Sequence, residues 1–280
     1  MQIIDGKAIA DKTKAETAKR AQKFEKKHGR KCGLAVVLIG NNPASAIYVN
    51  NKQKMCAEIG FDFFLHRLDE KVTQAEVLGL VGELCSSPAV DGILVQMPLP
   101  AHLDAFEIME AIDPRKDVDG FTAINTGNLC LGRACIVPGT PAGCLALLKT
   151  VCPDMAGKHA VVVGRSNIVG KPMAQLLLQE NCTVTVAHSK TVGLCNITKL
   201  ADILVVAIGK PRFITADMVK PGAIVIDVGI NRENDKILGD VDFENVKNVA
   251  GYITPVPKGV GPMTMAMLFE NLLKLGEQHG

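Results

Sequence analysis

Three side chains that could carry out acid–base chemistry share one face of an expected helix, Ala44 to Glu58. Ser45, Tyr48 and Lys52 stand at positions i, i+3 and i+7, a spacing that aligns them along a helix. A lysine can exchange a proton near neutral pH when burial or its neighbours lower its pKa. The same spacing is typical of a solvent-facing Tyr–Lys pair, so other segments have to supply partners for this chemistry.

Two further segments contain candidate partners. Gln96 ends an apolar run that begins at Gly92, and α/β proteins bind ligands at the carboxyl ends of such strands. Asp117 and Asp119 lie beside Gly120 in an expected loop. A carboxylate there could accept hydrogen bonds from a ligand, or it could simply cap a surface turn.

A glycine turn predicts a nucleotide site. The apolar run 160–163 is followed by Gly164, and Pro172 suits the first turn of a helix, where no amide donor is needed. Such a helix presents free N–H groups and the positive end of its dipole to a phosphate. The pattern is Gly-x-Ser-x-x-x-Gly rather than Gly-x-Gly-x-x-Gly, so a purely structural turn is the alternative.

The next expected strand favours one cofactor. Sites for NAD usually end this strand with an acid that binds the ribose 2′-hydroxyl. Here Ser189 and Lys190 follow the strand without a carboxylate, and together with Arg165 they could receive a 2′-phosphate. NADP is therefore favoured over NAD, although a solvated turn would also explain Ser189 and Lys190. Further along, Gly229 precedes Ile230 at a strand end, where backbone can approach a nicotinamide closely.

The elements that position these residues alternate along the chain, which predicts an α/β fold with parallel sheets. The expected strands are 33–39, 62–68, 92–96, 160–163, 183–187, 203–207 and 224–228. The expected helices are 44–58, 74–86, 140–150, 172–180 and 264–276, and residues 12–31 form the solvated face of another. We expect two domains: residues 1–120 plus 264–280 for catalysis, and 140–260 as a Rossmann-type nucleotide domain.

The composition of the chain excludes several classes of binding partner. The 280 residues carry 31 basic and 29 acidic side chains, and the net charge of +2 gives no strong field toward nucleic acid or an anionic membrane. The apolar runs are far shorter than the ~20 residues of a membrane span. Nine cysteines without Cys-x-x-Cys spacing and six scattered histidines predict neither a disulfide framework nor a metal site. Because no secretory signal is visible, we expect a cytoplasmic protein.

Together the motifs resemble the bifunctional methylenetetrahydrofolate dehydrogenase/methenyltetrahydrofolate cyclohydrolase family. The matching segments come in family order along the whole chain: 48–52, 95–100, 116–121, 164–166 and 255–264. The resemblance implies oxidation of 5,10-methylenetetrahydrofolate with NADP, followed by hydrolysis of the methenyl cation to 10-formyltetrahydrofolate. It also implies a cytoplasmic homodimer whose folate cleft lies between the two domains.

The resemblance also assigns roles to single residues. The catalytic set is Lys52, its partner Gln96, Tyr48, which packs on the folate ring system, and Asp119, which anchors the pterin. Other substrate contacts fall on Ser45, Gly259 and Pro262, and the nucleotide contacts on Gly164, Arg165, Ser166, Ser189, Ile230 and Thr254. Because Gln96 is uncharged, it can orient Lys52 without stabilising the ammonium as strongly as a carboxylate would. We therefore predict a lowered pKa for Lys52.

A few positions depart from the family pattern. Lys258 replaces the first glycine of Pro-Gly-Gly-Val-Gly-Pro. If that position needs a positive φ, a lysine there costs about 1 kcal/mol or more of strain, or else the loop has shifted. Gly139 stands where cysteine is common, Met97 replaces leucine, and residues 122–124 replace His-Pro-Tyr. None of these changes touches the expected catalytic set.

Two other functions remain open from the residues themselves. A dehydrogenase of another small metabolite, such as a shikimate dehydrogenase-like protein, would explain the glycine turn but would leave segments 95–100 and 116–121 without a role. A catalytically silent nucleotide-binding protein would be expected to lack Lys52 or Gln96, and both are present.

Overall fold

The computed structural model describes residues 1–234 and 236–279, and the chain forms two compact units. The six-stranded unit consists of Met1–Asp11, Leu129–Arg133 and Pro138–Met267, and the three-stranded unit of Lys12–Asn128, Ala134–Val137 and the chain from Leu268. Both units contain parallel sheets with helices, so the predicted two-domain α/β fold is confirmed. The domain limits expected from the sequence placed residues 1–11 in the catalytic domain. Those expected domain limits stay a prediction.

The sheet of the three-stranded unit has the order β3-β2-β4, and all its strands are parallel. Its strands are β2 (Gly33–Ile39), β3 (Asp62–Leu68) and β4 (Gly92–Val95). All seven residues of β2 are buried, as expected for a central parallel strand that is covered on both faces. In the register of the sheet, Val36 lies opposite Leu65 and Leu94. The three strands therefore end at one common edge.

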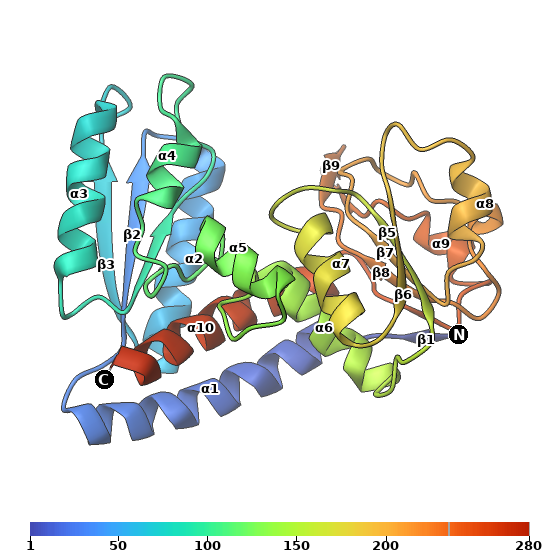
Figure 1. Ribbon diagram of the computed structural model, residues 1–280, viewed down its shortest axis with the longest axis horizontal. Coiled ribbons are helices and arrows are strands. Elements are labelled where there is room, and N and C mark those ends of the chain that lie inside the picture. Colours follow the sequence, from blue (N-terminus) through green and yellow to red (C-terminus); the bar gives the residue numbers. More distant parts are fainter. Residues whose placement is uncertain (235, 280) are drawn as a thin grey trace. The chain divides into compact units, whose positions relative to one another are not determined.

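The same unit contains several helices (Figure 1). They are α2 (Pro43–Ile59), α3 (Gln74–Ser86), α4 (Ala105–Glu110), most of α5 (Ala123–Cys130), and parts of α1 (Gly6–His28) and α10 (Val260–His279). Helix α3 begins with a capping box between Thr73 and Glu76, and it packs Val77 and Val81 in one apolar cluster with Val37 of β2. This core fixes the strand ends that hold the candidate site.

The larger sheet has the order β1-β11-β8-β7-β5-β6, and every neighbouring pair is parallel. Its strands are β1 (Gln2–Ile3), β5 (His159–Val163), β6 (Thr183–Ala187), β7 (Ile203–Val206), β8 (Ile224–Asp227) and β11 (Tyr252–Ile253). The other elements of this unit are α6 (Gly139–Val151), α7 (Gly170–Gln179), α8 (Leu194–Thr198), α9 (Phe243–Val246), the 3-10 helix η1 (Ala216–Met218) and the hairpin β9 (Asn231–Glu233) and β10 (Lys236–Leu238).

Alternate residues of the central strands enter two separate cores. Val162 and Val205 belong to a cluster with residues of α6, α7 and α10, including Leu147 and Met173. Val161 and its neighbours on the other face of the sheet pack with residues of α8, η1 and α9. This sandwich of helices around a parallel sheet is the layered arrangement that the continuous apolar strands predicted.

Most expected elements are present with small changes in their limits. The strands 33–39, 62–68 and 183–187 and the helix 74–86 have the predicted ends. Helix α10 begins at Val260 instead of residue 264, because the glycine- and proline-rich segment before it already contains the first helical turn. Strands β1 and β11 could not be predicted, since strands of two residues are too short to show a period.

Candidate active site

Helix α2 presents Lys52 to the carboxyl edge of the three-stranded sheet. The helix is capped by Asn42, whose Oδ1 accepts hydrogen bonds from the amides of Ala44 (2.9 Å) and Ser45 (3.2 Å). Lys52 is only 8% exposed, and its Nζ donates a 2.7 Å hydrogen bond to Oε1 of Gln96. The expected lysine–glutamine pair is thus in contact.

Gln96 is itself held in one orientation. It follows β4 directly, and its backbone amide donates to the carbonyl of Val37 (2.9 Å). Its side-chain Nε2 donates to the carbonyl of Met97 (2.7 Å), so Oε1 is the atom left to face Lys52. The buried Ser45 hydroxyl donates to the same Met97 carbonyl at 3.4 Å. These contacts tie one face of α2 to the end of β4.

The surroundings of Lys52 disfavour its protonated, charged form. Burial lowers the pKa of Lys52, and the negative charge of Asp119 opposes this shift only in part. Gln96 offers an acceptor without a compensating charge. The lowered pKa predicted from the sequence is confirmed in direction.

The two carboxylates of the 116–121 segment differ sharply. Asp117 is buried and accepts hydrogen bonds from the amides of Gly120 (2.9 Å) and Thr122 (2.8 Å) and from Nδ2 of Asn125 (3.0 Å), so it organises the loop. Within the part of the chain that the structure describes, no group donates a hydrogen bond to Asp119. Burial and the nearby Asp117 raise the pKa of Asp119 to about 7, while Lys52 acts in the opposite direction. Asp119 is therefore the carboxylate that is available to a ligand.

Tyr48 lies one turn before Lys52 on α2 and is 49% exposed. Its ring is thus accessible at the surface of the three-stranded unit, on the helix that presents the buried lysine. An exposed aromatic ring at this place can pack against a flat ligand without moving the core.

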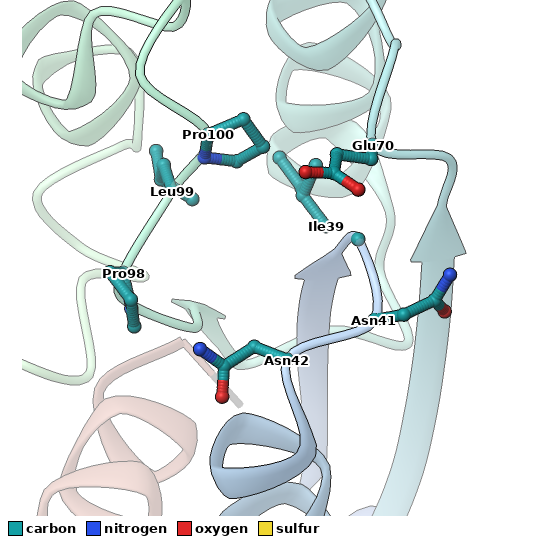
Figure 2. Close-up of a pocket in the computed structure, with 8 residues that line it drawn as sticks. Ile39, Asn41, Asn42, Glu70, Pro98, Leu99 and Pro100 are labelled. Carbon is teal, nitrogen blue, oxygen red and sulfur yellow. The ribbon is translucent and has the colours of Figure 1, made fainter.

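A pocket lies beside this group at the same edge of the sheet (Figure 2). It is lined by Ile39, Gly40, Asn41, Asn42, Glu70, Pro98, Leu99 and Pro100. Figure 2 shows the loop from Pro98 to Pro100 facing the segment that leads into α2, with the side chain of Asn42 turned toward Pro98. The strand-end loops next to Lys52 and Gln96 thus leave an opening.

In the six-stranded unit, the turn after β5 is built for close approach of backbone. Gly164 has φ +131°, and a Cβ atom there would lie 2.2 Å from the carbonyl oxygen of Ala207. A Cβ at Gly170 would lie 2.2 Å from the carbonyl oxygen of Gly164. Ser166 Oγ accepts hydrogen bonds from the amides of Val169 (3.1 Å) and Gly170 (3.3 Å) at the start of α7. The glycine pattern of the sequence thus corresponds to a real steric requirement.

A cationic pocket adjoins this turn. It has a volume of about 270 Å³ and is lined by Val163, Gly164, Arg165, His188, Ser189, Leu194, Ala207, Ile208, Lys210 and Phe213. None of these lining residues is acidic, so the pocket fits a phosphate-bearing ligand. Arg165 and Ser189 are in this lining as expected, whereas Lys190 is not. The sequence analysis missed Lys210, which lies in the loop after β7 with its Nζ 5.5 Å from the ring centre of Phe213.

The other expected contacts of the six-stranded unit lie outside this lining. Ile230 follows β8 and is 56% exposed, whereas Thr254 is fully buried and its Oγ1 accepts the amide of Asp227 at 2.8 Å. The side chain of Thr254 is thus already used inside the sheet. Gly259 and Pro262 lie at the start of α10, and a Cβ at Gly259 would be 2.4 Å from the carbonyl oxygen of Pro255.

Lys258 adopts a left-handed backbone conformation at the position where the family pattern has glycine. Its φ is +81°, a value that favours glycine, and its carbonyl accepts the amide of Lys7 at 3.0 Å. The condition set out from the sequence, a positive φ at Lys258, is therefore met, and a lysine in this conformation is strained.

A search of residues 1–234 and 236–279 finds no group of three or more histidine, cysteine or acidic side chains placed to hold a metal ion. Across the same residues, no helix combines the length and the apolar character needed to span a membrane.

The chain thus combines a glycine-turn nucleotide fold with a buried lysine held by a glutamine, the features of a two-domain nucleotide-dependent enzyme. Comparison with known proteins agrees. Residues 4–119 match the tetrahydrofolate dehydrogenase/cyclohydrolase catalytic domain, and residues 138–280 match the NAD(P)-binding domain of the same family. The chain belongs to the tetrahydrofolate dehydrogenase/cyclohydrolase family.

Individual relatives are similar over their full length. A Polaromonas protein called bifunctional protein FolD is 54% identical, with 99% of each chain covered. The crystal structure of the bifunctional FolD enzyme from Campylobacter jejuni is 48% identical, with a TM-score of 0.97 and 99% of both chains covered. The Trypanosoma brucei enzyme, solved with NADP cofactor and an inhibitor, is 37% identical, with a TM-score of 0.94 over 99% of this chain and 97% of that one.

The alternative dehydrogenase that the sequence left open is similar in fold alone. A shikimate dehydrogenase from Aquifex aeolicus is 13% identical with a TM-score of 0.53, and the match covers 88% of this chain and 97% of that chain.

Proposed function

We propose that this chain oxidises 5,10-methylenetetrahydrofolate with NADP and hydrolyses the methenyl product to 10-formyltetrahydrofolate. The observation that carries the proposal is the 2.7 Å hydrogen bond between the buried Lys52 ammonium nitrogen and Gln96, in a chain that belongs to this family. A buried lysine with a lowered pKa has no evident value for stability, because its desolvation is unfavourable. A role in the chemistry explains why a lysine occupies this buried position.

Hydride transfer requires the folate to be held in one orientation toward the nicotinamide. We assign Tyr48 to the face of the folate ring system, because its ring is accessible on the helix that presents Lys52. We assign Asp119 to the pterin, because its carboxylate lacks a hydrogen-bond donor in the described chain and can accept from an amino group and a ring N–H. Together, a flat contact and a directional contact fix the position of the methylene carbon.

The nucleotide requirement fits the six-stranded unit. NADP, when bound, accepts the hydride that leaves the methylene carbon. Gly164 lets the backbone of the turn approach a pyrophosphate closely, while the amides of Val169 and Gly170 are already bound to Ser166 Oγ. We assign Arg165, Ser166 and Ser189 to the phosphate-bearing ribose, and Arg165 and Ser189 line the cationic pocket. The acid-free lining around Arg165 and Ser189 supports NADP over NAD, because a carboxylate there would repel a 2′-phosphate. We place Ile230 at the nicotinamide on its exposed position after β8.

Hydrolysis of the methenyl cation needs the addition of water and one net proton loss. The water oxygen bonds to the cationic carbon, the bond from that carbon to N5 breaks, and the formyl group stays on N10. N5 takes up a proton in this step, and the remaining proton is released to solvent. Lys52, oriented by Gln96, is the group that can move these protons, since burial lowers its pKa and thereby favours the neutral, basic amine.

The proposal is tested by following both products from methylenetetrahydrofolate, with NADP compared with NAD. Formation of NADPH without lasting accumulation of methenyltetrahydrofolate is the expected result. NADPH formation with methenyl accumulation beyond its spontaneous hydrolysis would refute the cyclohydrolase assignment. The absence of any reduced nucleotide would refute the proposed dehydrogenase activity. The two alternatives would then be a dehydrogenase of another small metabolite, such as shikimate, and a catalytically silent nucleotide-binding protein.

The setting of the enzyme is part of the proposal. We place it in the cytoplasm as a homodimer that acts on tetrahydrofolate derivatives, without nucleic-acid or membrane partners. The balanced net charge of +2 supports the last point, because it gives little attraction to polyanionic surfaces. Light scattering of the purified protein tests the dimer, with a mass near twice 29.8 kDa as the expected result.

A further inference from the structure

One buried carboxylate joins the ends of two neighbouring strands in the six-stranded unit. Asp240 is completely buried, and both its oxygens are used. Oδ2 accepts the amides of Ile208 (2.7 Å) and Gly209 (2.9 Å), and Oδ1 accepts the amide of Lys210 (2.8 Å) and Nδ2 of Asn231 (2.9 Å). Three of these donors belong to the loop after β7, and the fourth follows β8.

The loop that Asp240 holds is a wall of the cationic pocket. Ile208 and Lys210 both line that pocket, opposite no acidic residue. Within the described chain, the Lys210 ammonium lies 5.5 Å from the centre of the Phe213 ring and pairs with no carboxylate. The backbone of the loop therefore sets where a positive charge stands in the pocket.

A second carboxylate fixes Asp240 itself. Asp227 accepts the amides of Asp240 (2.9 Å), Val241 (3.0 Å) and Gly229 (3.0 Å). Glycines make room for both groups: a Cβ at Gly229 would lie 2.2 Å from Asp240 Oδ1, and a Cβ at Gly239 would lie 1.8 Å from Asp227 Oδ2. The two aspartates thus form one connected, fully satisfied arrangement behind the pocket.

We infer that Asp240 is a positioning residue for nucleotide binding, which holds the loop 208–210 so that Lys210 contributes to recognition of the phosphate-bearing ribose. This inference rests on the proposed NADP-dependent function. It requires a carboxylate, because all four partners of Asp240 are N–H donors. An asparagine would turn an NH₂ group toward at least one of them and leave it without an acceptor.

The test is Asp240→Asn in the full chain, with both activities measured. The KM for NADP is expected to rise about tenfold or more, which corresponds to ~1.4 kcal/mol or more. The rate of methenyltetrahydrofolate hydrolysis is expected to stay within about twofold of wild type, because that step uses no nucleotide. Asn231→Ala removes only one of the four donors, and its expected rise in KM for NADP is about threefold.

The matched control is Asp202→Asn, at the opposite end of β7. Asp202 accepts the amide of His159 (2.9 Å) and pairs with Lys220 (2.6 Å), so its loss weakens the same unit without touching the pocket. Its expected effect is a lower Tm with an unchanged KM for NADP.

An unchanged KM for NADP in Asp240→Asn overturns the inference, and so does an equal loss of both activities. If Asp240→Asn does not fold, Asn231→Ala decides by the same readout, and an unchanged KM for NADP there overturns the inference. A wild-type protein that does not reduce NADP refutes the proposed function itself, so the two failures are distinguishable.

Discussion

The two units build their candidate sites from different parts of the residue. In the three-stranded unit the chemistry lies in side chains: Lys52 on a helix, Gln96 after a strand end and Asp119 in a loop. In the six-stranded unit the nucleotide turn itself depends on backbone, because a side chain at Gly164 or Gly170 would overlap a neighbouring carbonyl, and side chains such as Arg165 stand around this turn. Side-chain sites tolerate backbone-neutral changes and fail when one functional group is removed. A backbone site fails when a side chain is added where there is no room, and it tolerates the loss of a single functional group. Substitutions of these two kinds can therefore distinguish the two sites.

The largest expected effect is that of Lys52→Met on cyclohydrolase activity. Removing the amine takes away the proton-transfer group while keeping an apolar chain of similar length, and the rate is expected to fall by a factor of about 10³. The exposed Lys54 on the same helix gives a matched control, since Lys54→Met should retain activity. Full cyclohydrolase activity in Lys52→Met would contradict the assignment.

Gly164→Ala probes the backbone site. The new methyl group would lie 2.2 Å from the Ala207 carbonyl oxygen at a φ of +131°, so the turn has to shift. We expect NADP affinity to fall about 100-fold, as measured by titration, while methenyl hydrolysis continues. Gly79→Ala, in α3 with no atom within 4 Å of its added Cβ, serves as a harmless control. NADP affinity equal to wild type in Gly164→Ala would remove the distinction between the two kinds of site.

A smaller effect is expected from pH, through Asp119. Because the pKa of Asp119 is raised to about 7, its ionised fraction falls as the pH drops through 7. kcat/KM for methylenetetrahydrofolate should therefore decline below pH 7, and Asp119→Asn should lower it about tenfold and remove this limb of the profile.

The raised pKa of Asp119 also makes folding stability depend on pH. A carboxyl whose pKa is raised by folding binds its proton more tightly in the folded state, so folding stability falls as the pH rises through 4 to 7. Asp119→Asn should therefore raise Tm at pH 8 by about 2 to 4 °C while lowering activity. A lower Tm at pH 8 would argue that the carboxylate supports the fold instead of the ligand.

Lys258→Gly should give the smallest change. A glycine relieves the positive φ of +81°, and the free energy of unfolding should rise by about 1 kcal/mol in urea titrations. Lys23→Gly, at an exposed position within α1, provides a control of opposite sign, because glycine weakens a helix interior. Equal effects of the two changes would show that the loop carries no such strain.

Side-chain spacing made the three-stranded unit the easier half to predict. The run Gly33–Ile39 is continuously apolar, and the helix Gln74–Ser86 starts at a Thr-x-x-Glu capping box, so both have clear ends in the sequence. The Lys52–Gln96 contact could be expected only through the family resemblance, because 44 residues separate the two and no periodicity links them.

What the sequence could not supply are contacts between loops. Lys210 enters the pocket because a carboxylate 30 residues later holds its backbone, and neither residue carries a pattern that points to the other. The different roles of Asp117 and Asp119 depend likewise on which amides the loop turns inward. Such roles follow from three-dimensional closure and not from local preference.

The pairing of β1 with β11 has a consequence for synthesis on the ribosome. Gln2 lies opposite Tyr252, and Ile3 opposite Ile253, so β1 leaves the ribosome about 250 residues before the strand with which it pairs. At roughly 5–20 residues per second, this delay is about 12–50 s. During that time β1 has no β11 to join, and this edge of the larger sheet is completed only after Ile253 has been made.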